Sequence, residues 1–312
     1  MRSYKTTLLL SCLFFAVSAF AQDKGNFIWP VKLQKSYSKS YPVGTEQVVL
    51  LNRYGKMNIE TWDRNEVSVV ATIAVGAQNN DYAAKLLERI NILDEKKTAS
   101  IEFKTDMGDS HNNWSDDNNG GHEMHIDWTV KIPANAKLHA ENHFGPMDIG
   151  DYKGEAELIC KYGTLTAGKL SNSKLVTVEF GKAIIASVSD AQLLLRYSRV
   201  DISKLSGNIK AEMQFCNSVD LPIDNDLKQL ELKNNYTSLY LMIPKDLSAD
   251  YDITTNNARV STKNEALKEE KQDDPNIRRV SFSPNHHYVG SLGKGGGTRL
   301  LIRSNFGNIR IL

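Results

Sequence analysis

The chain has 312 residues and a nearly balanced charge, with 38 lysine and arginine side chains against 37 aspartate and glutamate side chains. Residues 1–21 hold two basic residues and no acidic ones, so their removal changes the formal net charge from +1 to −1. A near-neutral chain lacks the basic surface on which nucleic-acid binding depends, so the composition excludes that class of partner.

Residues 1–21 have the features of a signal peptide. Arg2 and Lys5 give it a positive start, an apolar stretch follows, and residues 19–21 (Ala-Phe-Ala) form a small-x-small cleavage site. The apolar stretch is too short to cross a bilayer, and the mature chain has no run of membrane-spanning length. Cys12 lies in a sequence similar to a lipoprotein site, but the apolar stretch continues past it, which argues against lipidation. We predict cleavage after Ala21 and export to the periplasm, the outer surface or the medium.

Residues 22–44 are expected to form a linker, and residues 45–140 a β-rich capping region. Alternating apolar side chains predict strands within three segments of this region, residues 46–75, 98–105 and 124–132. Apolar side chains at helical spacing predict one helix over residues 81–92. We expect this region to cover the end of the strands that follow, because an uncovered sheet edge recruits other chains.

A cluster of potential metal ligands lies inside the capping region. It consists of Asp109, His111, Asp116, Asp117, His122, Glu123, His125 and Asp127. Their spacing matches neither a zinc helix motif nor a calcium loop, and the intervening asparagines and glycines are typical of a solvated loop. We therefore expect no cofactor, and we keep His122, His125 and Asp127 as weak candidates for a metal site.

Residues 141–312 carry a recurring phrase, an aromatic residue that glycine or a small polar residue usually follows. The most regular column is Phe144, Tyr162, Phe180, Tyr197 and Phe215, with spacings of 18, 18, 17 and 18 residues. The phrase also occurs at Tyr54, Tyr236 and Phe306, with longer spacings. We interpret the aromatic column as a core or corner ladder rather than a sugar-stacking surface, and we expect the glycines to turn the corners with positive φ.

Apolar columns recur with the same period. They include Ile149, Ala167, Ile185 and Ile202; Tyr152, Leu170, Val188 and Leu205; Leu158, Val176, Leu193 and Ala211; and Cys160, Val178, Leu195 and Met213. Period-2 alternation within each strand, repeated about every 18 residues, predicts an all-β protein built as a parallel β-solenoid, or β-helix, of 18-residue coils. An antiparallel sandwich with hairpins at similar spacing is the alternative. The charged residues 263–279 are expected to be an insert between coils.

Two cysteines lie in the mature chain, Cys160 and Cys216. In the predicted register three strand spacings, about 14 Å, separate them. A disulfide requires Cα atoms within roughly 7 Å. We therefore predict two free thiols, with Cys160 buried and Cys216 at a turn.

The same register argues against catalysis. Hydrolysis of a glycosidic bond requires two carboxyl groups roughly 5–9.5 Å apart, whereas Asp148 and Asp201 share a column about 14 Å apart. Residues 290–298 are rich in glycine but lack the spacing of a phosphate-binding loop. We predict no catalytic residue and no enzymatic activity, with a polysaccharide lyase or hydrolase as the alternative.

Several segments resemble the bacterial putative-adhesin domain family of unknown function, which is related to autotransporter-adhesin head-like domains. The resemblance is carried by residues 52–63 and 66–69, by residues 130–133 leading to 142–145, and by residues 295–311. It covers residues 45–312 and implies an exported β-solenoid without an assigned catalytic site.

These observations together predict a non-enzymatic, exported protein that acts as an adhesin or as a binding or scaffold protein of the cell envelope. A glycan or an envelope protein is the expected partner. The alternatives are a carbohydrate-active enzyme on a β-helix and a sensory or regulatory component of the envelope stress response.

Overall fold

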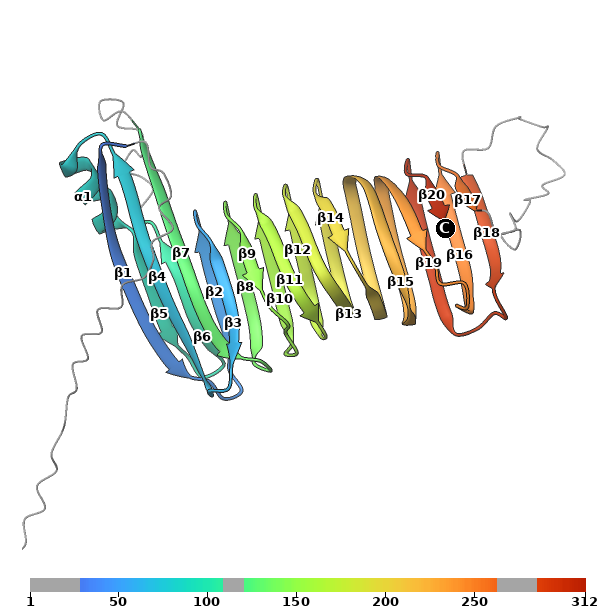
Figure 1. Cartoon of the computed structure of the whole chain (residues 1–312), viewed down its shortest axis with the longest axis horizontal. Helices are drawn as coiled ribbons and strands as arrows, with labels where there is room; N and C mark the ends of the chain where they lie inside the picture. Colours follow the sequence, from blue (N-terminus) through green and yellow to red (C-terminus); the bar gives the residue numbers. More distant parts are fainter. Residues whose placement is uncertain (1–28, 109–120, 263–284) are drawn as a thin grey trace, which may run out of the picture.

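The structure is a computed structural model, and it describes residues 29–108, 121–262 and 285–312. The predicted signal peptide with Cys12, the ligand-type residues 109–117 and the charged insert at 263–279 lie outside the described residues. In the described part, twenty strands join into one hydrogen-bonded sheet, and a single short helix accompanies them. The molecule is elongated, with the N-terminal strands at one end and the last strands at the other (Figure 1).

Antiparallel strands form the N-terminal end. β4 (Glu66–Ala77) lies between β1 (Val31–Pro42) and β7 (His122–Pro133) and pairs antiparallel with both. β5 (Asn91–Lys96) pairs antiparallel with β6 (Ser100–Asp106). These strands are long and alternate buried with exposed side chains, because their apolar residues recur every second position.

The predicted helix is present as α1 (Asn80–Arg89), which ends three residues before the predicted boundary. It begins where the Asn79 side chain accepts a hydrogen bond from the backbone nitrogen of Tyr82 (2.8 Å), since this satisfies one of the free amides of the first turn. Ala83 and Leu86 are buried on the inner face of the helix. The backbone is already extended at Ile90, which leads directly into β5.

Two rows of parallel strands form the middle of the molecule. The first row comprises β2 (Gln47–Arg53), β8 (Lys137–His143), β10 (Ala156–Lys161) and β12 (Ser173–Glu179). The second comprises β3 (Met57–Trp62), β9 (Met147–Ile149), β11 (Thr164–Leu170) and β14 (Arg199–Ile202). β13 (Lys182–Arg196) and β15 (Leu205–Met242) are long enough to turn corners and contribute to both rows. The sheet thus curls around one core until it nearly closes on itself.

The last five strands do not lie in the sheet in the order in which they follow along the chain. They are β16 (Ala249–Asn256), β17 (Val260–Thr262), β18 (Asn285–Leu292), β19 (Thr298–Asn305) and β20 (Ile309–Ile311). β19 lies between β15 and β16 and is parallel to both, whereas β18 pairs antiparallel with β16.

The predicted parallel β-solenoid, or β-helix, of 18-residue coils is therefore wrong as a fold class. The sheet has mixed strand orientation, with antiparallel pairs at both ends of the molecule. Spatial neighbours also do not follow one fixed offset, since Asn52 pairs with Asn142, 90 residues later, and Asn235 pairs with Asn305, 70 residues later. The spacing of similar side chains reports local register, but it does not report strand orientation at the ends of the sheet.

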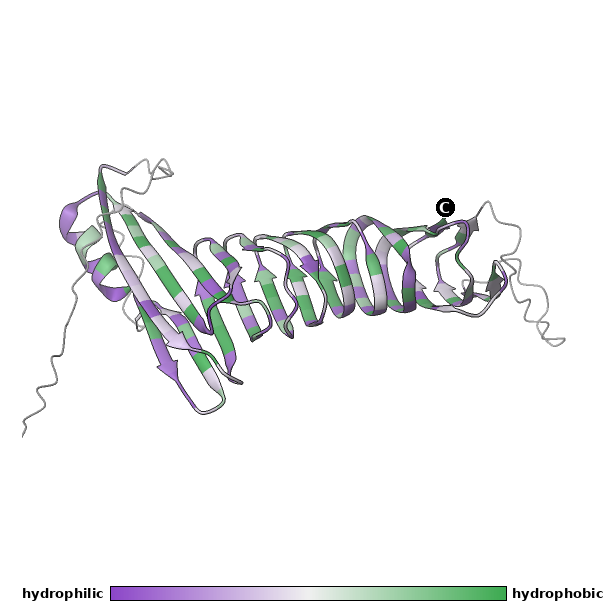
Figure 2. Cartoon of the chain, turned by 60° about the horizontal axis from the view of Figure 1, so that its bottom comes forward, coloured by the Kyte–Doolittle hydropathy of each residue, from purple (hydrophilic) through white to green (hydrophobic). Residues whose placement is uncertain are grey.

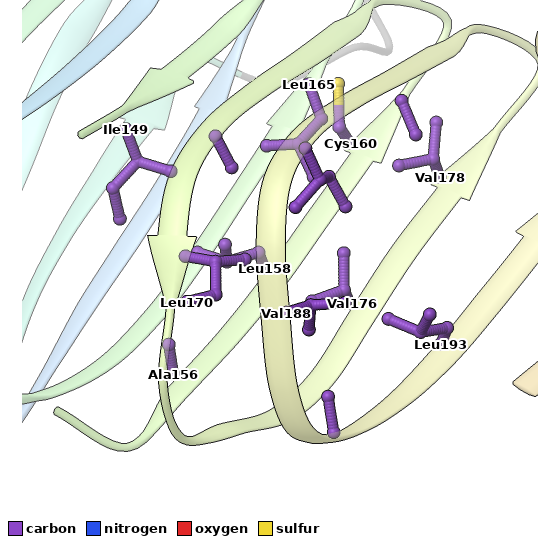
Figure 3. Packing of buried hydrophobic residues seen from close by; sticks show 14 of the residues in the cluster. Ile149, Ala156, Leu158, Cys160, Leu165, Leu170, Val176, Val178, Val188 and Leu193 are labelled. Carbon is purple, nitrogen blue, oxygen red and sulfur yellow. The ribbon is translucent and has the colours of Figure 1, made fainter. Parts of the chain in front are cut away.

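The local register itself is as predicted. Leu158 pairs with Val176, Val176 with Leu193 and Leu193 with Ala211. The column that begins at Tyr152 continues through Leu170, Val188 and Leu205 in the same way. These side chains are buried and pack against one another inside the curled sheet (Figure 3). Hydrophobic and hydrophilic residues alternate along the strands throughout the molecule (Figure 2).

Candidate functional site: an aromatic ladder

A continuous stack of eight aromatic rings follows one corner of the curled sheet. The stack, which we call the aromatic ladder, consists of Tyr54, Phe144, Tyr162, Phe180, Tyr197, Phe215, Tyr236 and Phe306. Adjacent ring centroids are 4.7–5.1 Å apart and adjacent ring planes differ by 2–9°. The five-residue column of the sequence is therefore confirmed, and three further rings extend it.

Every ring of the ladder belongs to a residue with positive φ, between 50° and 62°. This left-handed conformation is unfavourable for residues with a large side chain and costs about 1–2 kcal/mol each. Stacking of neighbouring rings contributes about 0.5–1.5 kcal/mol per pair and offsets part of that cost. The conformation turns the chain between the two rows of strands and aims each ring away from the core.

The glycine that follows several of these rings has a different role from the predicted one. It does not have positive φ; instead, its lack of a Cβ atom allows close packing of neighbouring turns. A Cβ on Gly163 would lie 2.0 Å from the carbonyl oxygen of Gly145, and a Cβ on Gly181 would lie 1.9 Å from that of Gly163. The prediction that glycine supplies the positive φ at these corners is therefore wrong, because the aromatic residue supplies it.

The ladder is half-exposed rather than part of the core. Seven of its rings, from Phe144 to Phe306, expose 43–51% of their surface. Because each ring face is covered by the next ring, the exposed parts are the ring edges and the tyrosine hydroxyl groups. Such a surface offers apolar contact and hydrogen bonds side by side along the length of the sheet.

Polar side chains border the ladder on both sides. The residues immediately before the rings form one flanking row of Arg53, His143, Lys161, Glu179, Arg196, Gln214, Asn235 and Asn305, none of which is buried. Glu179 forms ion pairs with Lys161 (3.2 Å) and Arg196 (3.3 Å), and Arg196 also forms one with Glu212 (2.9 Å). On the other side, Lys182 pairs across the sheet with Thr164 and with Arg199. Both flanks therefore carry hydrogen-bonding groups in register with the rings.

Apart from the ladder, an open groove of about 970 Å³ lies at the corner that follows β11. Its lining includes serine and lysine side chains and the carboxylates of Asp190, Asp226 and Asp246. Asp190 accepts hydrogen bonds from the backbone nitrogen (3.0 Å) and Nδ2 (2.9 Å) of Asn208, and these bonds hold its pKa below the usual range. Asp246 accepts a bond from Asn225 (3.2 Å).

The metal candidates of the sequence do not converge. His122, His125 and Asp127 all lie on β7, where His122 and His125 point to opposite faces. His122 contacts the hydroxyl of Tyr82 (3.1 Å), and burial lowers its pKa. His125 contacts Glu123 (2.9 Å), and Asp127 accepts a hydrogen bond from the backbone nitrogen of Lys56 (2.7 Å). In residues 29–108, 121–262 and 285–312, no three histidine, cysteine or acidic side chains are placed to hold a metal ion.

Both cysteines of the described chain are free and buried. Burial raises the pKa of Cys160 to about 12 and also raises that of Cys216. Cys216 lies at a turn, as predicted, between the positive-φ residues Phe215 and Asn217, and its thiol points inward to the carbonyl of Leu195 (3.3 Å).

The acidic pair considered for catalysis is separated as the register predicts. Asp148 pairs with Thr166, Thr166 with Ile184, and Ile184 with Asp201, so three strand spacings lie between the two carboxylates. Asp148 forms an ion pair with Lys56 (2.8 Å). In the glycine-rich residues 290–298, the backbone nitrogen of Gly296 donates to Asp250 (3.1 Å), so a carboxylate of the chain itself takes a donor that a phosphate would need.

Among the described residues, no helix combines the length and the apolar character needed to cross a membrane. No protein-family model matches the chain, and no curated protein matches it either.

Several solved structures are similar over most of their length, at low identity. A putative adhesin from Bacteroides fragilis NCTC 9343 is 11% identical with a TM-score of 0.41, and the match covers 89% of this chain and 97% of that one. A putative lipid binding protein from Parabacteroides distasonis ATCC 8503 is 9% identical with a TM-score of 0.34, covering 89% and 96%. A putative cell adhesion protein from Clostridium sporogenes ATCC 15579 is 13% identical with a TM-score of 0.18, covering 89% and 99%. At these TM-scores the similarity assigns neither a fold nor a function to this chain.

Proposed function

We propose that this chain is an exported, non-enzymatic binding protein with an adhesin-like or scaffolding role in the cell envelope, and that the aromatic ladder is its binding surface. The observation that carries the proposal is the continuous stack of eight rings in the left-handed conformation, seven of them half-exposed. A core would have buried these rings. The chain instead holds them at its surface, against an unfavourable backbone conformation.

The arrangement of the ladder suits recognition of an elongated partner. Its rings project from successive strands in a single line, so the surface is long and narrow, and the polar flanking rows follow it on both sides. Aromatic edges contribute apolar contact area, and the neighbouring charged and amide groups provide hydrogen bonds that fix the position of a ligand.

A second candidate function, a carbohydrate-active enzyme, is favoured by one observation, the three carboxylates that line the groove at Asp190, Asp226 and Asp246. Glycoside hydrolysis needs one carboxyl group whose pKa is raised, so that it can donate a proton. The pKa of Asp190 is shifted in the opposite direction by its bonds to Asn208. Asp190 therefore does not fit the role of that proton donor.

The test is a binding assay with residues 22–312 and their ladder variants against insoluble envelope polysaccharides and immobilised envelope proteins. Phe180→Asn combined with Phe215→Asn removes two rings, and asparagine tolerates positive φ, so the backbone is not strained further. The control is Leu93→Asn, since Leu93 on β5 is 52% exposed and lies outside the ladder. We expect the control to bind as the parent does and the ladder variant to lose binding. Release of reducing sugar from a polysaccharide that the chain does not retain would overturn the proposal in favour of the enzyme.

A further inference from the structure

Tyrosine and phenylalanine alternate strictly along the ladder. The order from Tyr54 to Phe306 is Tyr, Phe, Tyr, Phe, Tyr, Phe, Tyr, Phe, although the chain reaches its first and last rings from distant segments. Hydroxyl groups therefore recur on every second strand, on Tyr54, Tyr162, Tyr197 and Tyr236. Since strands are spaced about 4.8 Å apart, successive hydroxyl-bearing rings are roughly 10 Å apart.

Ring stacking does not require this alternation. Rings with and without a hydroxyl group stack equally well through their faces, and an all-phenylalanine ladder would bury the same faces. Within the described residues, the hydroxyls of these four tyrosines make no hydrogen bond to another protein group, whereas the buried Tyr152 donates to the carbonyl of Ala136 (2.8 Å). The ladder hydroxyls are thus available to a ligand at a regular interval.

The width of the ladder restricts the class of ligand. A stable protein interface buries about 800 Å² on each partner and is depleted in charge at its centre. The ladder is one ring wide, and charged residues such as Lys161, Glu179 and Arg196 lie directly beside it. A narrow, polar and extended chain matches this surface better than a folded protein does.

We infer that the ligand of the ladder is an extended β-1,4-linked polysaccharide that lies along the stack with two sugars per hydroxyl interval. In such a chain each sugar advances the polymer by a distance close to one strand spacing, and equivalent substituents return to the same side at every second sugar. The tyrosine hydroxyls meet equivalent sugar hydroxyls, the phenylalanine edges contact the sugars between them, and the flanking rows bond the outer substituents. This inference rests on the proposed function, in which the ladder is the binding surface.

The experiment measures binding of residues 22–312 to soluble oligosaccharides by isothermal titration calorimetry. The probes are cellohexaose and chitohexaose, with two-fold β-1,4 linkage, and maltohexaose, an α-1,4-linked glucan that coils and does not keep the repeat. Shorter β-1,4 oligosaccharides of two and four sugars test whether affinity increases with each two-sugar step. We expect at least one β-1,4 hexasaccharide to bind, and maltohexaose not to bind.

Two sets of variants test the contribution of the tyrosine hydroxyl groups without removing any ring of the ladder. Tyr162→Phe combined with Tyr197→Phe keeps every stacked ring and removes two hydroxyls, so we expect it to weaken binding roughly threefold to tenfold for each one. Phe180→Tyr, which adds a hydroxyl out of phase, is the matched control for a change at the ring edge and should not strengthen binding. Thermal unfolding of each variant verifies that the stack is intact.

Three results would overturn the inference. The first is that neither cellohexaose nor chitohexaose binds, or that maltohexaose binds as tightly as they do. The second is β-1,4 binding that the two tyrosine substitutions do not change. The third is concentration-dependent self-association that Phe180→Asn abolishes, which would make a second copy of the chain the occupant. In the second case the proposed function survives if Phe180→Asn still weakens binding. In the third case the ladder is still a binding surface, so the proposed function survives. If Phe180→Asn keeps every interaction of the parent chain, both this inference and the proposed function are wrong.

Discussion

The carbonyl oxygen of Gly145 lies 2.0 Å from the position that a Cβ atom on Gly163 would occupy. Successive turns of the curled sheet are therefore in backbone contact beneath the aromatic ladder. The close approach explains why glycine follows several of the rings, and it gives the first prediction.

Substitution of Gly163 by alanine should destabilise the protein by about 3 kcal/mol, because neither turn can move without disturbing the strands it joins. Gly150→Ala is the control, since no atom lies within 4 Å of a Cβ at that position and its φ is not positive. We expect Gly150→Ala to change stability by less than about 0.5 kcal/mol. Urea unfolding followed by circular dichroism measures both, and similar midpoints for the two variants would contradict the contact.

Substitution of Phe180 tests the balance between stacking and backbone strain. Phe180→Asn loses two stacked pairs and should cost about 1–3 kcal/mol. Phe180→Ala loses the same pairs but lacks the tolerance of asparagine for positive φ, so it should cost about 1 kcal/mol more. Chemical denaturation compares the two. If the variants are equally stable, the left-handed backbone at this corner imposes no cost.

The two buried thiols should not react in the folded protein. Because burial raises the pKa of Cys160 to about 12, its reactive thiolate is nearly absent at pH 8. A thiol reagent added to native residues 22–312 should label neither cysteine rapidly, and it should label two per chain after denaturation without reductant. A count of zero in the denatured chain would reveal a disulfide, and rapid labelling of the native chain would show that Cys160 or Cys216 is accessible.

Glu157 should make the stability of the folded protein decrease at low pH. Its carboxylate contacts Lys174 (2.6 Å) and His139 (2.9 Å), and the bonds to Lys174 and then to His139 hold its pKa below the ordinary value of 4.5. A lowered pKa in the folded state means that the stabilisation is complete above the ordinary pKa and is lost as the pH falls through the folded-state pKa. Glu157→Gln should therefore cost about 1 kcal/mol at pH 7 and less at pH 3.

The matched control for this prediction is Glu95→Gln, because the side chain of Glu95 is 64% exposed and its ion pair with Lys97 is on the surface. We expect that variant to follow the parent at every pH. Urea unfolding between pH 3 and pH 7 gives the comparison. A stability difference for Glu157→Gln that does not shrink toward pH 3 would refute the role of its charge.

Local register was predictable from the sequence, but strand orientation was not. Period-2 alternation places Leu158, Val176 and Leu193 in one column, since only matching apolar faces can share a core. The same alternation is present in β4, whose neighbours β1 and β7 are antiparallel to it. Orientation there depends on pairings between segments far apart in the chain, such as Val31 with Ala77, and no local pattern records them.

The aromatic ladder was predicted from the sequence as a core or corner ladder, but not as a functional site. The regular spacing of Phe144 and Tyr162 predicts the stack correctly, yet the apolar character of the rings favours burial, and the structure leaves them half-exposed. The decisive feature is the positive φ of the aromatic residue, for which the sequence carries no signal, because glycine beside it is the residue usually expected to adopt that conformation. The strict alternation of tyrosine and phenylalanine was visible in the sequence and could have indicated the surface.

The orientation of the strands has a mechanical consequence. They run across the long axis of the molecule (Figure 1), so the hydrogen bonds between them run along it. We therefore expect tension applied between the two ends to separate the strand pairs one after another, instead of breaking many hydrogen bonds at once. A polymer held along the aromatic ladder would bridge successive strands and stiffen the protein in the direction in which it is weakest.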